Sequence, residues 1–161
     1  MTDSRTADVQ LPQDVPPDWA NSLMAWALKT PVIQSMVGQG VALLTFSGHK
    51  SARSYTIPVS YYREGDTVTV ITKRVRNWWR NFETPAEVRL RLAGEEFDGI
   101  ARIRSEDEDK LEFMTDYLAK RPVDAKAYGL AKDEIVKEKI ARIIPHIVVI
   151  DITLAEANQP I

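Results

Sequence analysis

The pattern of hydrophobic and polar positions begins as a helix and changes to strands near residue 41. In the first part, apolar residues fall on one face of a helix, with Trp19, Leu23 and Trp26 at i, i+4 and i+7. From Val41 to Phe46 the chain is almost continuously apolar, which predicts a buried strand. Residues 55–62 then alternate with a period of two, which predicts a strand with one buried face.

More strands and a second helical region follow. Further strands are expected over residues 67–72, 88–92, 97–104 and 147–154. Between the last two, one helix is expected to start with a capping box of Ser105 and Glu108, and another is expected to be capped by Asp133. A short helix is expected near Trp78. Short antiparallel strands with few crossovers favour a small barrel with helices packed outside it.

The ends of the chain set the domain organisation. Residues 1–17 are polar and proline-rich without a periodic apolar face, so we expect a flexible tail there and one domain over residues 18–161. The longest apolar runs are much shorter than a membrane span, and no signal-peptide pattern opens the chain. We therefore expect a cytoplasmic protein without integral membrane association.

Composition narrows the possible chemistry. The absence of cysteine excludes disulfides, zinc–thiolate sites and cysteine nucleophiles. Only two histidines are present, so we expect no metal site. The second, His146, continues the alternation of Val148 and Ile150, which predicts a buried structural histidine. With 21 Lys+Arg against 23 Asp+Glu the net charge is −2, which argues against a nucleic-acid binder.

Two basic segments are candidates for a binding site. The first is the polar loop 47–53, in which Lys50 and Arg53 flank Ser51. A tight loop with backbone N–H groups, a hydroxyl and two cations suits an anionic group. A solvated hairpin loop explains the same residues equally well.

The second basic segment ends a strand and runs into aromatic residues. Thr72–Arg76 brings three cations into five residues, directly before the Trp78–Phe82 segment. Cations at a strand end beside a helix N-terminus suit a phosphate group. Alternatively, the aromatic residues plug the barrel while the cations stay in water. In the strand before it, Pro58 cannot donate to a ladder and indicates a sheet edge, a bulge or a barrel mouth.

Both segments resemble one known family. Residues 43–52, Leu-Leu-Thr-Phe-Ser-Gly-His-Lys-Ser-Ala, are similar to the Leu-Leu-Thr-Thr-x-Gly-Arg-Lys-Ser-Gly opening of the deazaflavin (F-420)-dependent nitroreductase family. The pair Thr72-Lys73 and the segment Trp78–Phe82 resemble the Ser-Lys and Trp-Tyr-x-Asn-Leu elements of that family. The resemblance covers about residues 19–103.

The resemblance implies a mainly β fold with helices. This fold is a split antiparallel β-barrel with peripheral helices, of the pyridoxamine-phosphate-oxidase-like kind found in the flavin and deazaflavin oxidoreductase superfamily. By position, Lys50 and Ser51 would hold the phosphate or acidic tail of a coenzyme. Arg53 would substitute for an arginine that the family carries where this chain has Tyr55. His49 and Ala52 also depart from the family, which has arginine and glycine there.

The remaining site residues also follow from the resemblance. Thr72 and Lys73 would lie near the ring or the phosphate of the coenzyme, and Trp78 and Asn81 would shape the floor of the site. Pro58 matches the proline of the second strand. Because the cofactor supplies the hydride, the protein mainly orients it and stabilises developing charge.

These patterns do not identify the group that would donate a proton to the reduced acceptor. Either Tyr128 or Tyr117 could protonate a reduced acceptor, and water could do so equally well. The family resemblance implies a homodimeric oxidoreductase that uses reduced deazaflavin, or alternatively FMN, to reduce a quinone-like, nitro or other conjugated small molecule. The alternative is a non-catalytic split-barrel carrier of FMN, haem or a lipid.

Overall fold

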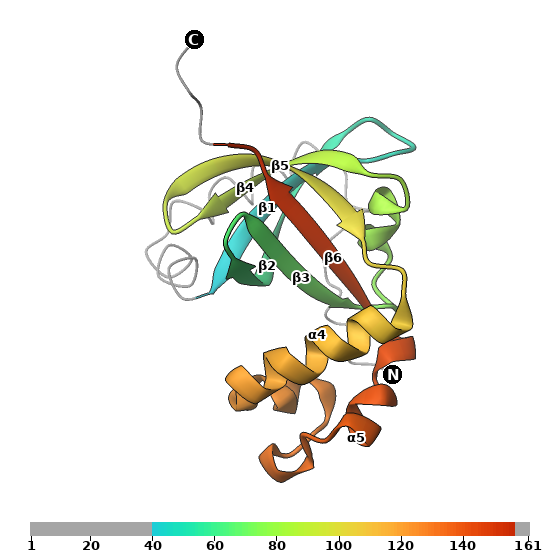
Figure 1. The fold of residues 1–161 in the computed structure, drawn as a ribbon. Helices are drawn as coiled ribbons and strands as arrows, with labels where there is room; N and C mark the ends of the chain where they lie inside the picture. The colour runs from blue at the N-terminus through green and yellow to red at the C-terminus, as the bar shows by residue number, and fades with distance from the viewer. Residues whose placement is uncertain (1–39, 157–161) are drawn as a thin grey trace.

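Six antiparallel strands close into a barrel in the computed structural model, which describes residues 40–156 (Figure 1). The strands are β1 (Val41–Ser47), β2 (Ser54–Glu64), β3 (Thr67–Lys73), β4 (Ala86–Leu92), β5 (Glu95–Ile103) and β6 (Ile147–Leu154). Their order around the barrel is β1-β2-β3-β6-β5-β4. All the strands expected from the sequence are present. The tail over 1–17 and the helices expected between residues 18 and 40 lie outside the described residues.

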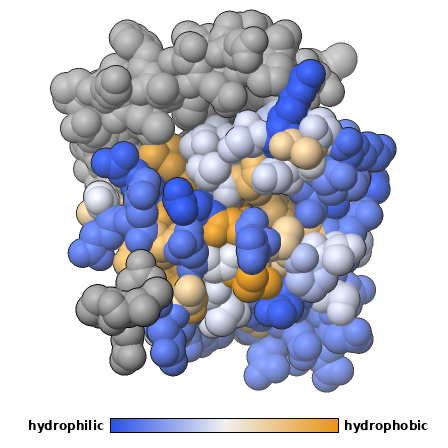
Figure 2. Space-filling view, turned by 90° about the horizontal axis from the view of Figure 1, so that it is seen from above, coloured by the Kyte–Doolittle hydropathy of each residue, from blue (hydrophilic) through white to orange (hydrophobic). Residues whose placement is uncertain are grey.

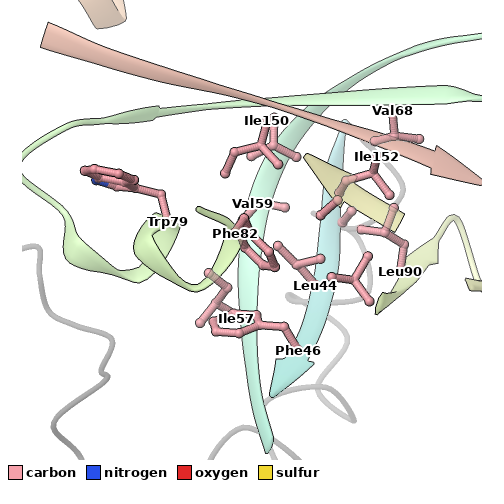
Figure 3. Packing of buried hydrophobic residues seen from close by; sticks show 14 of the residues in the cluster. Leu44, Phe46, Ile57, Val59, Val68, Trp79, Phe82, Leu90, Ile150 and Ile152 are labelled. Carbon is pink, nitrogen blue, oxygen red and sulfur yellow. The ribbon is translucent and has the colours of Figure 1, made fainter. Parts of the chain in front are cut away.

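Alternating side chains fill the inside of the barrel. In β4, for example, Val88, Leu90 and Leu92 are buried while Arg89 and Arg91 are exposed. The buried residues shown in Figure 3 include Leu44, Phe46, Ile57, Val59, Val68, Trp79, Phe82, Leu90, Ile150 and Ile152. Burial of these apolar side chains is the main force that holds the strands together.

Strand β2 pairs differently along its two halves. Residues 54–60 pair with β1, whereas only residues 61–64 pair with β3. The last residues of β3, from Ile71 to Lys73, pair with β6 alone. The barrel therefore splits between the first half of β2 and the end of β3. Pro58 lies in the half of β2 that has no β3 partner, which confirms its expected place at a sheet edge.

A close approach of two strands depends on one glycine. A Cβ atom on Gly99 would lie 2.8 Å from the backbone oxygen of Thr153 and 2.9 Å from a methyl carbon of Ile152. Only glycine therefore lets β5 pair with β6 at this register.

Most of the helices cover one end of the barrel and form a second core with β6. They are α4 (Asp107–Lys120), η2 (Pro122–Tyr128), η3 (Lys132–Glu134), α5 (Lys137–Ala141) and η4 (Ile144–His146). The short helix η1 (Asn77–Phe82) contributes its aromatic side chains to the barrel core instead. Met114, Leu118 and Ile140 from the helices pack against Ile147 and Val149 on the outer face of β6. Both faces of β6 are thus buried. None of the helices within residues 40–156 is long and apolar enough to cross a membrane.

The opposite end of the barrel is not covered by these helices. Seen from above, this end shows mostly hydrophilic residues around its periphery and a patch of hydrophobic residues near its centre (Figure 2).

Three local expectations from the sequence are wrong. Helix α4 begins at Asp107 after Glu106, without a side-chain cap, so Ser105 and Glu108 do not form a capping box. Acidic residues in its first turn favour the start through the helix dipole instead. The helix expected after Asp133 begins only at Lys137, because a short 3-10 turn comes first.

His146 is the third correction. It is exposed and ends η4, immediately before β6 begins at Ile147. The strand alternation of Val148 and Ile150 does not extend back to it, so it is not a buried histidine.

Candidate functional site

The loop between β1 and β2 is a closed turn with exposed polar side chains. The backbone N–H of Ala52 donates to the oxygen of Gly48 at 2.8 Å, and that of Gly48 donates to the oxygen of Arg53 at 2.7 Å. A Cβ on Gly48 would lie 2.7 Å from the Ser51 hydroxyl oxygen and 2.8 Å from a ring carbon of Tyr55, so a larger residue would require these two side chains to shift. The side chains of Lys50, Ser51 and Arg53 are all exposed.

A histidine and an asparagine fasten this loop to η1. Both the backbone N–H and the ring Nδ1 of His49 lie 2.9 Å from Oδ1 of Asn81. Because that oxygen only accepts, the ring nitrogen carries the proton. The amide nitrogen of Asn81 donates to the backbone oxygen of Trp78 at 2.7 Å. Asn81 thus joins two segments that the sequence pattern had singled out separately.

Helix η1 inserts aromatic side chains into the barrel end. Phe82 and Trp78 pack edge-on to each other. The ring centres of Phe46 and Phe82 lie 5.2 Å apart (Figure 3). Trp78 is 8% exposed, so little of its ring is open to a ligand. The aromatic residues therefore act as a plug, as the structural alternative predicted.

Arg74, one of the cations beside this plug, is held by contacts with protein groups. The guanidinium of Arg74 lies 5.4 Å from the centre of the Trp79 ring, and its Nε donates to the backbone oxygen of Pro145 at 3.1 Å. The indole N–H of Trp79 donates to the backbone oxygen of Arg74 at 3.0 Å. These contacts tie η1 to the turn after β3.

Thr72 and Lys73 point in opposite directions at the end of β3. Thr72 is 5% exposed and faces the barrel interior together with Val68 and Val70. Its hydroxyl is a buried polar atom without a hydrogen-bond partner among the described residues. Lys73 is exposed on the outer face. A buried hydroxyl without a partner costs free energy, and a bound water or ligand would relieve that cost.

A pocket of about 780 Å³ opens on the outer side, between the end of β3 and the helices. Its lining includes Lys73, Arg74 and Tyr128, together with residues of α5 and η4. Burial, and secondarily the charge of Asp124, raise the pKa of Tyr128 to about 12. The Tyr128 hydroxyl therefore stays protonated at neutral pH.

The other candidate tyrosine has a different setting. Tyr117 is buried, and its hydroxyl donates to Oδ2 of Asp124 at 2.6 Å, an oxygen that also accepts from Arg121 at 2.9 Å. Its ring stacks on Phe113 and lies edge-on to Tyr62. Burial and the hydrogen bond raise the pKa of Tyr117 above its usual range. Tyr117 does not line the pocket that holds Tyr128.

The contacts link most candidate residues into one strip. From the β1–β2 loop, the strip runs through the His49–Asn81 contact to η1, then through Trp79 to Arg74, and ends in the pocket with Lys73 and Tyr128. Pro58 lies apart, exposed in the middle of β2. Within residues 40–156, no group of acidic residues and histidines could hold a metal ion.

Sequence reasoning missed the far wall of this pocket. Arg142, Ile143 and His146 line it, although they lie about seventy residues after Lys73 in the chain. Only the pairing of β3 with β6 brings them together, since Lys73 is the register partner of Ile147. Among these residues, His146 was expected from the sequence to be a buried structural histidine, so it was not assigned to a site.

The topology places the chain in the class of pyridoxamine 5′-phosphate oxidase-like split barrels. A putative pyridoxamine 5′-phosphate oxidase from Listeria innocua has 13% sequence identity and a TM-score of 0.50, over 86% of this chain and 95% of that one. The haem storage protein HutZ from Vibrio cholerae has 12% identity and a TM-score of 0.50, over 79% and 90% of the two chains. At such identities the likeness concerns the fold alone, and it confirms the predicted barrel.

The family follows from the sequence itself. The profile of the family described as F420H(2)-dependent quinone reductase matches residues 22–134. The chain belongs to this family, which confirms the resemblance to deazaflavin-dependent reductases. No curated protein sequence matches the chain significantly.

Proposed function

We propose that the protein is an oxidoreductase that uses a reduced deazaflavin coenzyme to reduce a quinone-like, nitro or other conjugated acceptor. One observation carries the proposal beyond family membership. The Lys50–Arg53 loop, η1 and the Tyr128 pocket form a continuous strip through the contacts of His49, Asn81 and Arg74. Such a strip suits a long anionic coenzyme with a ring at one end.

The residues of the strip fit such a coenzyme. Lys50, Arg53 and Lys73 are exposed and have no ion-pair partner among residues 40–156, so they are available to phosphate and carboxylate groups. The exposed Ser51 hydroxyl adds a neutral hydrogen-bonding group to the same loop. Thr72 faces the barrel interior and does not line this outer strip, so a water or bound group that satisfied its hydroxyl would have to lie inside the barrel end.

In this proposal, the chain's own residues anchor and orient the coenzyme, and one of them protonates the acceptor. A bound reduced deazaflavin supplies a hydride, that is, two electrons and one proton. A quinone needs one further proton to become a quinol. We assign its donation to the Tyr128 hydroxyl, which lines the pocket, and not to Tyr117, whose hydroxyl is committed to Asp124. Solvent then returns the proton to Tyr128.

A stopped-flow experiment under anaerobic conditions tests this function. Reduced deazaflavin coenzyme is mixed with the protein and menadione, and coenzyme absorbance is followed. We expect one coenzyme to be oxidised per quinone reduced, and Tyr128→Phe to slow this by about 100-fold. An unchanged rate in Tyr128→Phe would assign the proton to water. Oxidation no faster than without protein would contradict the proposed reaction.

The assembly and the alternative ligands belong to the same proposal. One similar structure, with 16% identity and a TM-score of 0.50 over 86% of this chain and 99% of that one, is described as a domain-swapped dimer. We propose a homodimer here too, which analytical ultracentrifugation would test. The HutZ fold is used for haem storage, so carriage of haem, FMN or a lipid is the competing function. A cytoplasmic location remains a prediction.

A further inference from the structure

The pocket beside Tyr128 has walls of two kinds. Tyr128, Leu130, Ile143 and Ile147 give it an apolar and aromatic side. Basic side chains from three separate segments give it a second side, namely those of Lys73, Arg74, Lys139, Arg142 and His146. Apolar and aromatic side chains suit a conjugated ring. The basic wall calls for an explanation of its own.

The charge of the basic wall is only partly compensated within the described residues. Glu134 is the single carboxylate of the lining, and the ammonium of Lys139 occupies it at 2.7 Å. Arg74 is held by backbone oxygens, which accept its N–H groups without neutralising its charge. Neither Arg142 nor Lys73 forms an ion pair within residues 40–156.

Among these cations, Arg142 is the best placed to bind an anionic group of a ligand in the pocket. It directly follows α5, which ends at Ala141, and lies next to Ile143 of the apolar wall. Lys73 comes from the opposite wall and belongs to the coenzyme strip. A guanidinium binds a carboxylate, sulfonate or phosphate through two parallel N–H donors, which a lysine cannot do.

We propose that the pocket selects conjugated acceptors that carry an anionic group, and that Arg142 is the residue that recognises this group. The inference rests on the proposed function, since it names the substrate class of the same site. The ring of the acceptor packs on the wall of Tyr128 and Ile143, and its acidic substituent faces Arg142. A neutral quinone lacks that second contact and binds more weakly.

Two acceptors and two variants test the proposal. The acceptors are menadione, which is neutral, and 1,4-naphthoquinone-2-sulfonate. The variants are Arg142→Gln and, as a matched control, Arg91→Gln, which changes an exposed arginine of β4 outside the pocket. We expect Arg142→Gln to raise KM for the sulfonate at least tenfold and to change KM for menadione by less than twofold. Arg91→Gln should change neither. Because each acceptor is compared across variants, their different reactivities cancel.

A second measurement does not depend on turnover. Calorimetric titration with naphthalene-2-sulfonate, which cannot be reduced, should show binding to the protein without coenzyme. We expect the affinity to fall at least tenfold in Arg142→Gln and to be unchanged in Arg91→Gln. Equal affinities in all three proteins would overturn the proposal.

The outcomes also separate this inference from the proposed function. If the protein binds no deazaflavin but Arg142→Gln still weakens naphthalene-2-sulfonate binding, the reductase function fails and the anion site stands. If the coenzyme binds and reduces both quinones with the same KM in wild type and Arg142→Gln, the anion site fails and the reductase stands. If Arg142→Gln weakens coenzyme binding instead, the arginine serves the coenzyme tail and the inference is wrong.

Discussion

The segment Asn77–Phe82 resembles a coenzyme-binding element and also closes the end of the barrel with its aromatic side chains. Phe82 is 1% exposed and packs against Phe46 and Trp78 at the barrel end. Asn81 stands one residue earlier and holds the β1–β2 loop. The segment therefore closes the barrel with one set of side chains and positions a basic loop with another.

The first prediction concerns Phe82. Replacing it by alanine leaves a cavity among Phe46 and Trp78, so we expect Phe82→Ala to lower the free energy of unfolding by about 3–5 kcal/mol. Val75→Ala is the control, because Val75 is 84% exposed and should change stability by less than about 0.5 kcal/mol. Urea unfolding followed by tryptophan fluorescence measures both. Equal effects in the two variants would show that Phe82 is not part of the core.

The second prediction uses the raised pKa of Tyr128. The folded-state pKa is about 12, against about 10 in an unfolded chain. The folded protein thus holds this proton more tightly, and the resulting stability is present below pH 10 and is lost as pH rises toward 12. We expect the free energy of unfolding of the wild type to fall by about 1 kcal/mol relative to that of Tyr128→Phe between pH 9 and pH 11. A constant difference across this range would mean that Tyr128 titrates normally.

Part of the candidate site could be predicted from residue types and their order in the sequence. The cations Lys50 and Lys73 and the amide of Asn81 were found from the sequence because they lie in short segments with a recognisable order. The orphaned hydroxyl of Thr72 and the exposure of His146 were not, because each depends on which strand face or helix end the residue occupies.

At the scale of elements, strands were easier to predict than helix ends. Alternation in β2 and β4 reports burial on one face directly. Helix α5 starts later than Asp133 suggested, because a 3-10 turn uses the first residues. Several residues in this region have the capping pattern of a helix start. Tertiary packing of Ile140 and its neighbours determines at which of them the helix begins.

The contact between the β1–β2 loop and η1 gives the third prediction. Asn81→Ala removes the acceptor for His49, so we expect a stability loss of about 1 kcal/mol per hydrogen bond removed and faster amide exchange over residues 48–53. Asn77→Ala is a matched control in the same helix, at an exposed position. Hydrogen exchange measured by mass spectrometry reads out both variants. Unaltered exchange in the loop would mean that the two elements are not coupled.

The fourth prediction concerns the same loop as an anchor. Lys50→Ala removes a charge-assisted contact to the anionic part of the coenzyme, so we expect binding to weaken by about 1–3 kcal/mol. Lys132→Ala, an exposed lysine of η3, should leave binding unchanged. Titration of coenzyme fluorescence gives both affinities. The loop is not the anchor if the two variants bind equally well.

At the scale of the whole molecule, a nearly neutral chain concentrates its cations locally. The net charge is −2, yet Lys50, Arg53, Lys73 and Arg74 lie along a single strip. Three parts of this strip, namely the β1–β2 loop, the end of β3 and η1, lie close together in the sequence, so the order of their motifs was enough to predict them. The fourth, which includes Arg142, follows only from the β3–β6 pairing, so no local pattern could predict it.

The central claim is that this strip binds a deazaflavin coenzyme, and one measurement tests it most directly. The purified protein is titrated in parallel with reduced deazaflavin coenzyme, FMN and haem, and binding is followed by fluorescence and absorbance. The account predicts micromolar or tighter binding of the deazaflavin, weakened by Lys50→Ala. Binding of FMN or haem with no detectable deazaflavin binding at high micromolar concentrations would contradict it and favour a carrier.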